Sequence, residues 1–243
     1  MTNWVLLRGL GRDKRHWGDF PKLMRNAFPN SKILAVDLPG VRGESAVPTN
    51  IHDMVDEVRE SWMEEASEKE NWNLLAISLG GMLAIDWCYR HPNDFNHLVT
   101  MNTSSKTTSS LFERITPAAL STVGKAIISK DLRQREKRVL EITTNLANIN
   151  EDLLDEWVDI AQSMKLTRLN LIKQLYAASK FKLPKKLQIP YTVLASKADR
   201  FVDYSCSQNI ARRYNAPLFL HETAGHDLTL DDPNWVIKIL QDI

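Results

Sequence analysis

Six short apolar runs alternate along the chain with longer amphipathic stretches. Runs of this length that end at turn-forming residues are typical of strands buried on both faces of a sheet. Because these runs alternate with helical patterns, the sequence predicts an α/β fold with a mostly parallel central sheet flanked by helices. The predicted strands cover residues 4–7, 32–36, 72–77, 97–101, 191–195 and 218–221.

Helical spacing is clearest over residues 51–65, where apolar side chains recur three and four positions apart. A second helix is predicted over residues 81–89, ending before Pro92, and a last one from Trp235, after Pro233. These helices lie between predicted strands or after the last strand, as a parallel arrangement requires.

The stretch from residue 104 to residue 186 breaks this alternation because it holds no convincing strand. It contains helical patterns instead, including 152–164 and 166–180. An insertion of roughly 80 residues is far longer than an ordinary connection. We therefore expect residues 1–103 and 187–243 to form a core, and residues 104–186 to form a helical cap, or lid, over the strand ends, where ligands bind.

Ser78 follows the third predicted strand directly, and Gly80 and Gly81 follow it at the start of a helix. The segment matches the nucleophile elbow G-x-S-x-G, with Ala76 at the first glycine position. Small residues two positions away allow a tight turn that exposes the hydroxyl above a helix N-terminus, which stabilises negative charge. The alternative is a serine that only caps its helix.

A serine nucleophile needs a base, and the base needs an orienting acid. Asp199 follows the fifth predicted strand and His226 follows the sixth, in the chain order Ser, Asp, His. Asp203 remains open as the acid and His221 as the base, because each lies close to the preferred residue in sequence.

An oxyanion hole needs two backbone N–H groups. We expect one from Leu79, directly after the serine, and one from Leu10, between Gly9 and Gly11 in the loop after the first strand. The same glycines do not indicate a dinucleotide site, because the third glycine of G-x-G-x-x-G is missing.

Taken together, these segments resemble the α/β-hydrolase superfamily over nearly the whole chain. The closest shape is that of the small capped carboxylesterases, which include methyl ester esterases that act on a pimeloyl group carried by acyl carrier protein. Arg8 departs from the family, which usually has histidine there, and Ala76 is a mild departure. The matching segments are 8–11, 37–40, 76–81, Asp199 and 225–233.

The resemblance implies a serine hydrolase that cleaves a carboxylic ester through an acyl-enzyme on Ser78, with Asp199 and His226 completing the triad. Thioester, amide or C–C bond hydrolysis and cofactor-free haloperoxidase chemistry remain open on the same fold. A ligand receptor without activity also remains open. Dehalogenase and epoxide hydrolase activity are disfavoured, since both would require a carboxylate at position 78.

Charge is distributed unevenly although the net charge is only +1. Residues 104–186 hold 15 Lys and Arg against 9 Asp and Glu, a local net charge of +6. A basic cap suits an acidic acyl carrier protein as the donor of the substrate. The alternative is an ordinary solvated helical surface, on which i,i+4 charges pair. The balanced total gives no indication of nucleic-acid binding.

Composition sets the remaining expectations. No apolar run approaches the roughly 20 residues that span a bilayer, and the first residues do not have the pattern of a signal peptide. Cys88 and Cys206 lie far apart without metal-type spacing, which favours reduced, buried thiols in a cytoplasmic protein. We expect neither a metal nor a cofactor.

Overall fold

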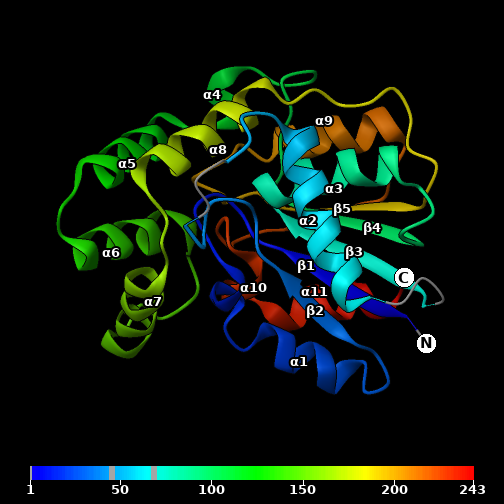
Figure 1. The fold of residues 1–243 in the computed structure, drawn as a ribbon, viewed down its shortest axis with the longest axis horizontal. Helices are drawn as coiled ribbons and strands as arrows, with labels where there is room; N and C mark the ends of the chain where they lie inside the picture. Colours follow the sequence, from blue (N-terminus) through cyan, green and yellow to red (C-terminus); the bar gives the residue numbers. More distant parts are fainter. Residues whose placement is uncertain (1, 44–46, 67–69) are drawn as a thin grey trace.

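The computed structural model describes residues 2–43, 47–66 and 70–243. Six parallel strands form one sheet in the order β2-β1-β3-β4-β5-β6 (Figure 1). The predicted parallel sheet is confirmed, and each predicted strand lies within one residue of the observed one at either end. The strands are β1 (Asn3–Leu7), β2 (Ile33–Val36), β3 (Trp72–Ile77), β4 (His97–Met101), β5 (Tyr191–Ser196) and β6 (Leu218–His221).

Helices connect the strands and cover both faces of the sheet (Figure 1). The predicted helix over 51–65 is α2 with the same bounds, whereas α3 begins two residues before the predicted start at 81. The core elements are η1 (Lys14–Trp17), α1 (Phe20–Ala27), α2 (Ile51–Glu65), α3 (Leu79–Arg90), α9 (Ser205–Tyr214), α10 (Leu228–Asp231) and α11 (Pro233–Gln241).

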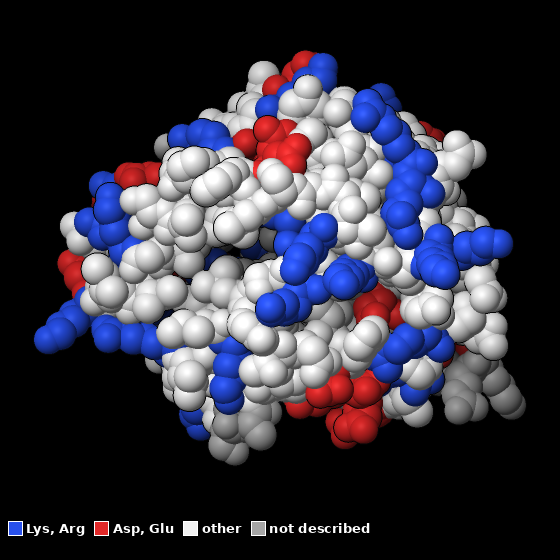
Figure 2. Space-filling view, turned by 90° about the horizontal axis from the view of Figure 1, so that it is seen from above, with Lys and Arg blue, Asp and Glu red and all other residues white. Residues whose placement is uncertain are grey.

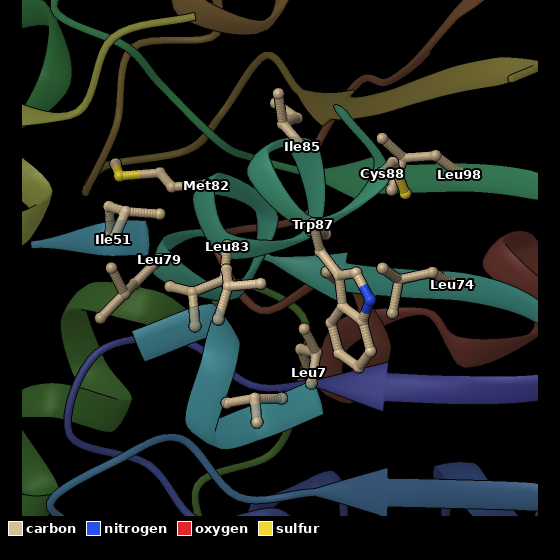
Figure 3. Close-up of a cluster of buried hydrophobic side chains, with 14 of the residues drawn as sticks. Leu7, Ile51, Leu74, Leu79, Met82, Leu83, Ile85, Trp87, Cys88 and Leu98 are labelled. Atoms are coloured by element: carbon tan, nitrogen blue, oxygen red, sulfur yellow. The ribbon is translucent and has the colours of Figure 1, made fainter. Parts of the chain in front are cut away.

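The alternation of side chains along each strand creates two apolar layers. Val5 and Leu7 of β1 pack into a cluster with α2, α3 and α9, while Trp4 and Leu6 pack into a second cluster with α1 and α11. Figure 3 shows the first layer, where Trp87 and its neighbours on α3 lie against the strands. Burial on both faces explains why the central strands β1, β3, β4 and β5 read as continuous apolar runs, whereas the edge strands β2 and β6 are only partly buried.

Five helices lie between β4 and β5, where the sequence predicts a helical insertion. The structure describes every residue from 102 to 190, and this stretch contains no strand. Helices α6 and α7 pack on each other through a small cluster that includes Leu140 and Trp157. The insertion comprises α4 (Leu111–Arg114), α5 (Pro117–Ile128), α6 (Leu132–Thr143), α7 (Glu151–Ser163) and α8 (Arg168–Lys180).

The strand order reverses direction between β1 and β3, because β2 lies on one side of β1 and all later strands lie on the other. In open parallel sheets, ligands bind at such a switch point, outside the carboxyl ends of the strands. Residues 8–11 follow β1 and Ser78 follows β3, so the topology places both at this crevice.

Two further expectations concern the thiols and membrane spans. Cys88 and Cys206 are buried free thiols, and burial raises the pKa of Cys206 to about 11 and that of Cys88 well above its ordinary value. Within the described ranges, none of the helices has the length and hydropathy needed to cross a bilayer.

Candidate active site

Ser78 lies in the tight turn between β3 and α3, and its backbone is strained. Its φ of 56° and ψ of −118° form a conformation that costs a residue with a side chain roughly 1–3 kcal/mol. A Cβ added at Gly80 would lie 2.4 Å from the Arg8 carbonyl oxygen. One added at Gly81 would lie 2.8 Å from the Thr103 side chain. Close packing against the ends of β1 and β4 therefore holds this turn in place.

Asp199 and His226 follow β5 and β6, and their side chains are in contact. Nδ1 of His226 lies 2.7 Å from Oδ2 of Asp199, and the two side chains are 8% and 1% exposed. The other carboxylate oxygen of Asp199 accepts the backbone N–H groups of Phe201 and Val202. Because a carboxylate only accepts, the imidazole donates its Nδ1 proton and its Nε2 keeps a lone pair.

The alternative acid and base that the sequence leaves open have other partners. Asp203 accepts the backbone N–H of Ser205 at the start of α9. His221 accepts two backbone N–H groups of the turn that follows it through Nδ1, and its Nε2 lies 3.2 Å from Asp232. Both side chains therefore stabilise turns in this structure.

Ser78 and His226 line one cavity of about 130 Å³, whose walls come from the core and from the insertion. A hydrogen bond from the Ser78 hydroxyl to the imidazole is not among those that the described residues form. In unliganded sites such bonds are often long and tighten only with substrate. The apolar lining residues are Leu10, Ile77, Val123, Ala126, Ile127, Val139, Trp157, Leu166, Leu171 and Phe201.

The loop that carries Leu10 passes very close to the serine. A Cβ added at Gly9 would lie 3.2 Å from the Cβ of Ser78, so glycine permits this approach. The neighbouring N–H of Gly11 donates to the Gln174 side chain of α8 at 2.9 Å. In the described part of the chain, neither the Leu10 N–H nor the Leu79 N–H donates a hydrogen bond. Among the described residues, the two N–H groups predicted for an oxyanion thus have no protein acceptor, one directly after Ser78 and one in the loop that passes it.

Arg8 is buried and forms two bonds with the equally buried Asp227. Its Nη1 and Nη2 lie 3.2 and 2.5 Å from Oδ1 and Oδ2 of Asp227. Burial raises the pKa of Asp227, but the Arg8 charge together with the hydrogen bonds from Arg8 and Thr229 holds that pKa below its ordinary value. Because Asp227 directly follows His226, the pair connects the end of β1 to the imidazole loop. Sequence reasoning missed this pair, whose members are 219 positions apart.

A second buried pair, also missed from sequence, joins the loop after β1 to the insertion. Nη1 of Arg12 lies 2.5 Å from Oε2 of Glu136 in α6, and its guanidinium lies 4.5 Å from the Trp157 ring centroid in α7. Arg135 occupies the other oxygen of Glu136. Both carboxylates in the cavity wall are thus paired with arginine, and the described residues contain no cluster suited to a metal ion.

His16 lies next to Arg12 of this pair, and its burial makes the free energy of unfolding depend on pH. It is buried, with Nε2 facing Nη1 of Arg12 at 3.3 Å. Burial lowers its pKa to about 4. The unfolded chain takes up this proton near pH 6.5, so acidification from there to pH 4 favours unfolding by roughly 3 kcal/mol. The free energy of unfolding of His16→Gln, measured in urea, should lack this part of the pH dependence. The same pH dependence in the variant and the wild type would contradict the role of His16. Exposed His52→Gln is the matched control.

Comparisons with known proteins identify a hydrolase family and fold. The family described as serine aminopeptidase, S33, matches residues 27–233. An esterase from Exiguobacterium antarcticum superposes with a TM-score of 0.79 at 15% identity, covering 100% of this chain and 91% of that one. A 2-hydroxy-6-oxo-6-phenylhexa-2,4-dienoate hydrolase from a Rhodococcus species gives a TM-score of 0.78 at 15% identity, covering 99% and 89%. At these identities the likeness shows the α/β-hydrolase fold.

One curated relative is similar over a shorter stretch. The biotin biosynthesis bifunctional protein BioHC of Teredinibacter turnerae is 31% identical over 103 residues. The match covers 41% of this chain and 17% of that protein, so this chain spans well under two thirds of the relative's length.

Proposed function

We propose that this chain, which belongs to the serine aminopeptidase S33 family of α/β-hydrolases, hydrolyses a carboxylic ester through an acyl-enzyme on Ser78. The observation that carries the proposal is the convergence at one cavity. A strained serine and the imidazole of His226 line it, and Asp199 holds that imidazole from behind at 2.7 Å.

In the proposed mechanism, Nε2 of His226 takes the proton of the Ser78 hydroxyl as its oxygen attacks the ester carbonyl. The N–H groups of Leu10 and Leu79 bind the oxyanion. The imidazolium, whose charge Asp199 offsets, then protonates the leaving alcohol. Water repeats the sequence, frees the acid and restores the serine.

The cavity supports an ester with a compact apolar acyl group. Its volume of about 130 Å³ is close to that of an engineered cavity that takes benzene, so an acyl group of roughly six carbons fits. An aminopeptidase would need a carboxylate for the substrate ammonium group. The two in the wall, Glu136 and Asp227, are already bound by arginines. This pairing favours an ester over an amino-terminal peptide.

A fluorophosphonate probe tests the proposal and separates an enzyme from a receptor on the same fold. We expect rapid labelling at Ser78 and turnover of p-nitrophenyl esters, highest near six acyl carbons by the cavity argument. Mass spectrometry of the labelled peptide identifies the site. Tight ligand binding with neither labelling nor turnover would instead establish a receptor. If thioesters or amides with the same acyl group were cleaved faster than esters, the proposed reaction would be thioester or amide hydrolysis instead.

A carrier-linked acyl ester is the second candidate substrate. The similarity to a biotin biosynthesis protein and the local charge of +6 over residues 104–186 support a pimeloyl methyl ester on an acidic acyl carrier protein. The test compares kcat/KM for the carrier-linked methyl ester with kcat/KM for the free methyl ester. A kcat/KM no higher for the carrier-linked ester would exclude the carrier as a recognised partner.

A further inference from the structure

Helix α8 buries two polar amides and exposes three large apolar side chains. Asn170 and Gln174 are buried, and both donate hydrogen bonds to backbone carbonyls of the core. Leu169, Ile172 and Tyr176 are 59%, 47% and 52% exposed. A helix on the surface of a globular protein ordinarily shows the opposite division. The outer face of α8 therefore has a property that packing within this chain does not explain.

Cations lie on both sides of this apolar stripe. At 100° per residue, Arg168 lies on one edge, and Lys173 and Lys180 lie on the other. The Lys180 ammonium group also lies 5.3 Å from the Tyr176 ring centroid. From residue 160 to residue 198 the sequence has eight Lys and Arg and no Asp or Glu. No carboxylate from this stretch offsets the charge of the helix.

Helix α4 extends the same surface. Arg114 donates to the carbonyl groups of Ala178 and Ser179, which fixes α4 at the C-terminal end of α8. Leu111 and Phe112 of α4 are 56% and 65% exposed. Figure 1 shows both helices on the upper side of the molecule, and Figure 2 looks down on that side. There, Figure 2 shows Lys and Arg side chains beside uncharged surface, together with a group of Asp and Glu.

We propose that the outer face of α8, extended by α4, binds the surface of an anionic lipid bilayer. An apolar stripe with cations along its edges is the pattern of a helix that lies in the headgroup region. Its aliphatic side chains enter the acyl boundary, its tyrosine lies at headgroup level, and its cations contact lipid phosphates. A convex stripe on one helix suits a deformable lipid surface better than a protein, which must match about 800 Å² on each partner.

The proposed lipid-binding surface lies close to the cavity that holds Ser78. Arg168 and Leu171, on the first turn of α8, line the cavity that holds Ser78. A bilayer bound to the outer face of α8 would therefore lie near the cavity mouth. Lipid binding itself requires no chemistry at the serine, so the proposal stands or falls independently of the ester hydrolase proposal.

Vesicle sedimentation tests the proposal with the full chain. We expect binding to vesicles of phosphatidylcholine mixed with phosphatidylglycerol, weaker binding to phosphatidylcholine alone, and loss of binding at high salt. Each cation at such a surface contributes roughly a factor of five in affinity. The double variant Lys173→Glu, Lys180→Glu should therefore bind at least ~25-fold more weakly. Ile172→Ser with Tyr176→Ser should also reduce binding.

Matched controls separate this surface from general effects. Phe219→Ser removes an apolar side chain of similar exposure from β6, and Lys238→Glu reverses an exposed charge on α11. Both should bind vesicles like the wild type, and all variants should keep the wild-type melting temperature. No binding of the wild-type chain, or undiminished binding of both double variants, would overturn the proposal. So would α8-dependent binding to an acidic acyl carrier protein without any binding to vesicles.

Discussion

Replacing Ser78 with alanine should abolish ester turnover while leaving the fold intact. The hydroxyl is the proposed attacking group, and loss of the nucleophile from such a triad lowers kcat by roughly 10⁶-fold. Alanine keeps the Cβ, so the close approach of the Gly9 backbone to that atom is unchanged. The measurement is p-nitrophenyl ester hydrolysis, with circular dichroism to verify folding. A folded Ser78→Ala protein that retains turnover would refute the acyl-enzyme.

Glycine at the same position separates the chemical role from the structural one. Ser78 adopts φ 56°, which glycine tolerates and other residues adopt only at a cost. We therefore expect Ser78→Gly to be as inactive as Ser78→Ala but more stable, by about 1 kcal/mol. Equal unfolding free energies for the two variants would mean that the turn stores no strain.

The fold was predictable because its four central strands, β1, β3, β4 and β5, are buried on both faces. Such strands read as apolar runs whatever packs on them, so their bounds followed from hydropathy to within one residue. Helix α9 was harder, since Ser205 to Tyr214 bury only one narrow face and carry many polar residues. Helix α8 also has a weak periodic pattern, because its exposed apolar residues and buried amides oppose each other.

The site was predictable in part for a related reason. Chain order and strand ends placed Asp199 and His226 together, and the 2.7 Å contact agrees with that placement. The pairs of Arg8 with Asp227 and Arg12 with Glu136 were not predictable. No periodicity links residues so distant in sequence. The sequence alone also does not distinguish a buried charged residue from an exposed one, because burial depends on a partner that is not yet known.

Replacing Asp199 with asparagine should lower kcat by roughly 10⁴-fold, the effect of imposing the wrong imidazole tautomer on a serine triad. One Asp199 oxygen accepts two backbone N–H groups, from Phe201 and Val202. The carbonyl oxygen of asparagine must take that place, because an amide NH₂ cannot accept. The NH₂ then faces Nδ1 of His226 and requires it to accept. The ring proton moves to Nε2, which can no longer receive the proton of Ser78.

The variant Asp203→Asn provides the matched control, because Asp203 has the same chemistry and accepts the N–H of Ser205 instead. We expect it to keep kcat within a few-fold of the wild type. Comparable losses in both variants would mean that general damage to the loop, not the tautomer, limits the rate. If Asp203→Asn alone lost activity, Asp203 would be the orienting acid. We expect Asp199→Asn to lose activity instead, because Asp199 contacts the His226 imidazole at 2.7 Å. A carboxylate at hydrogen-bonding distance sets the tautomer of the ring.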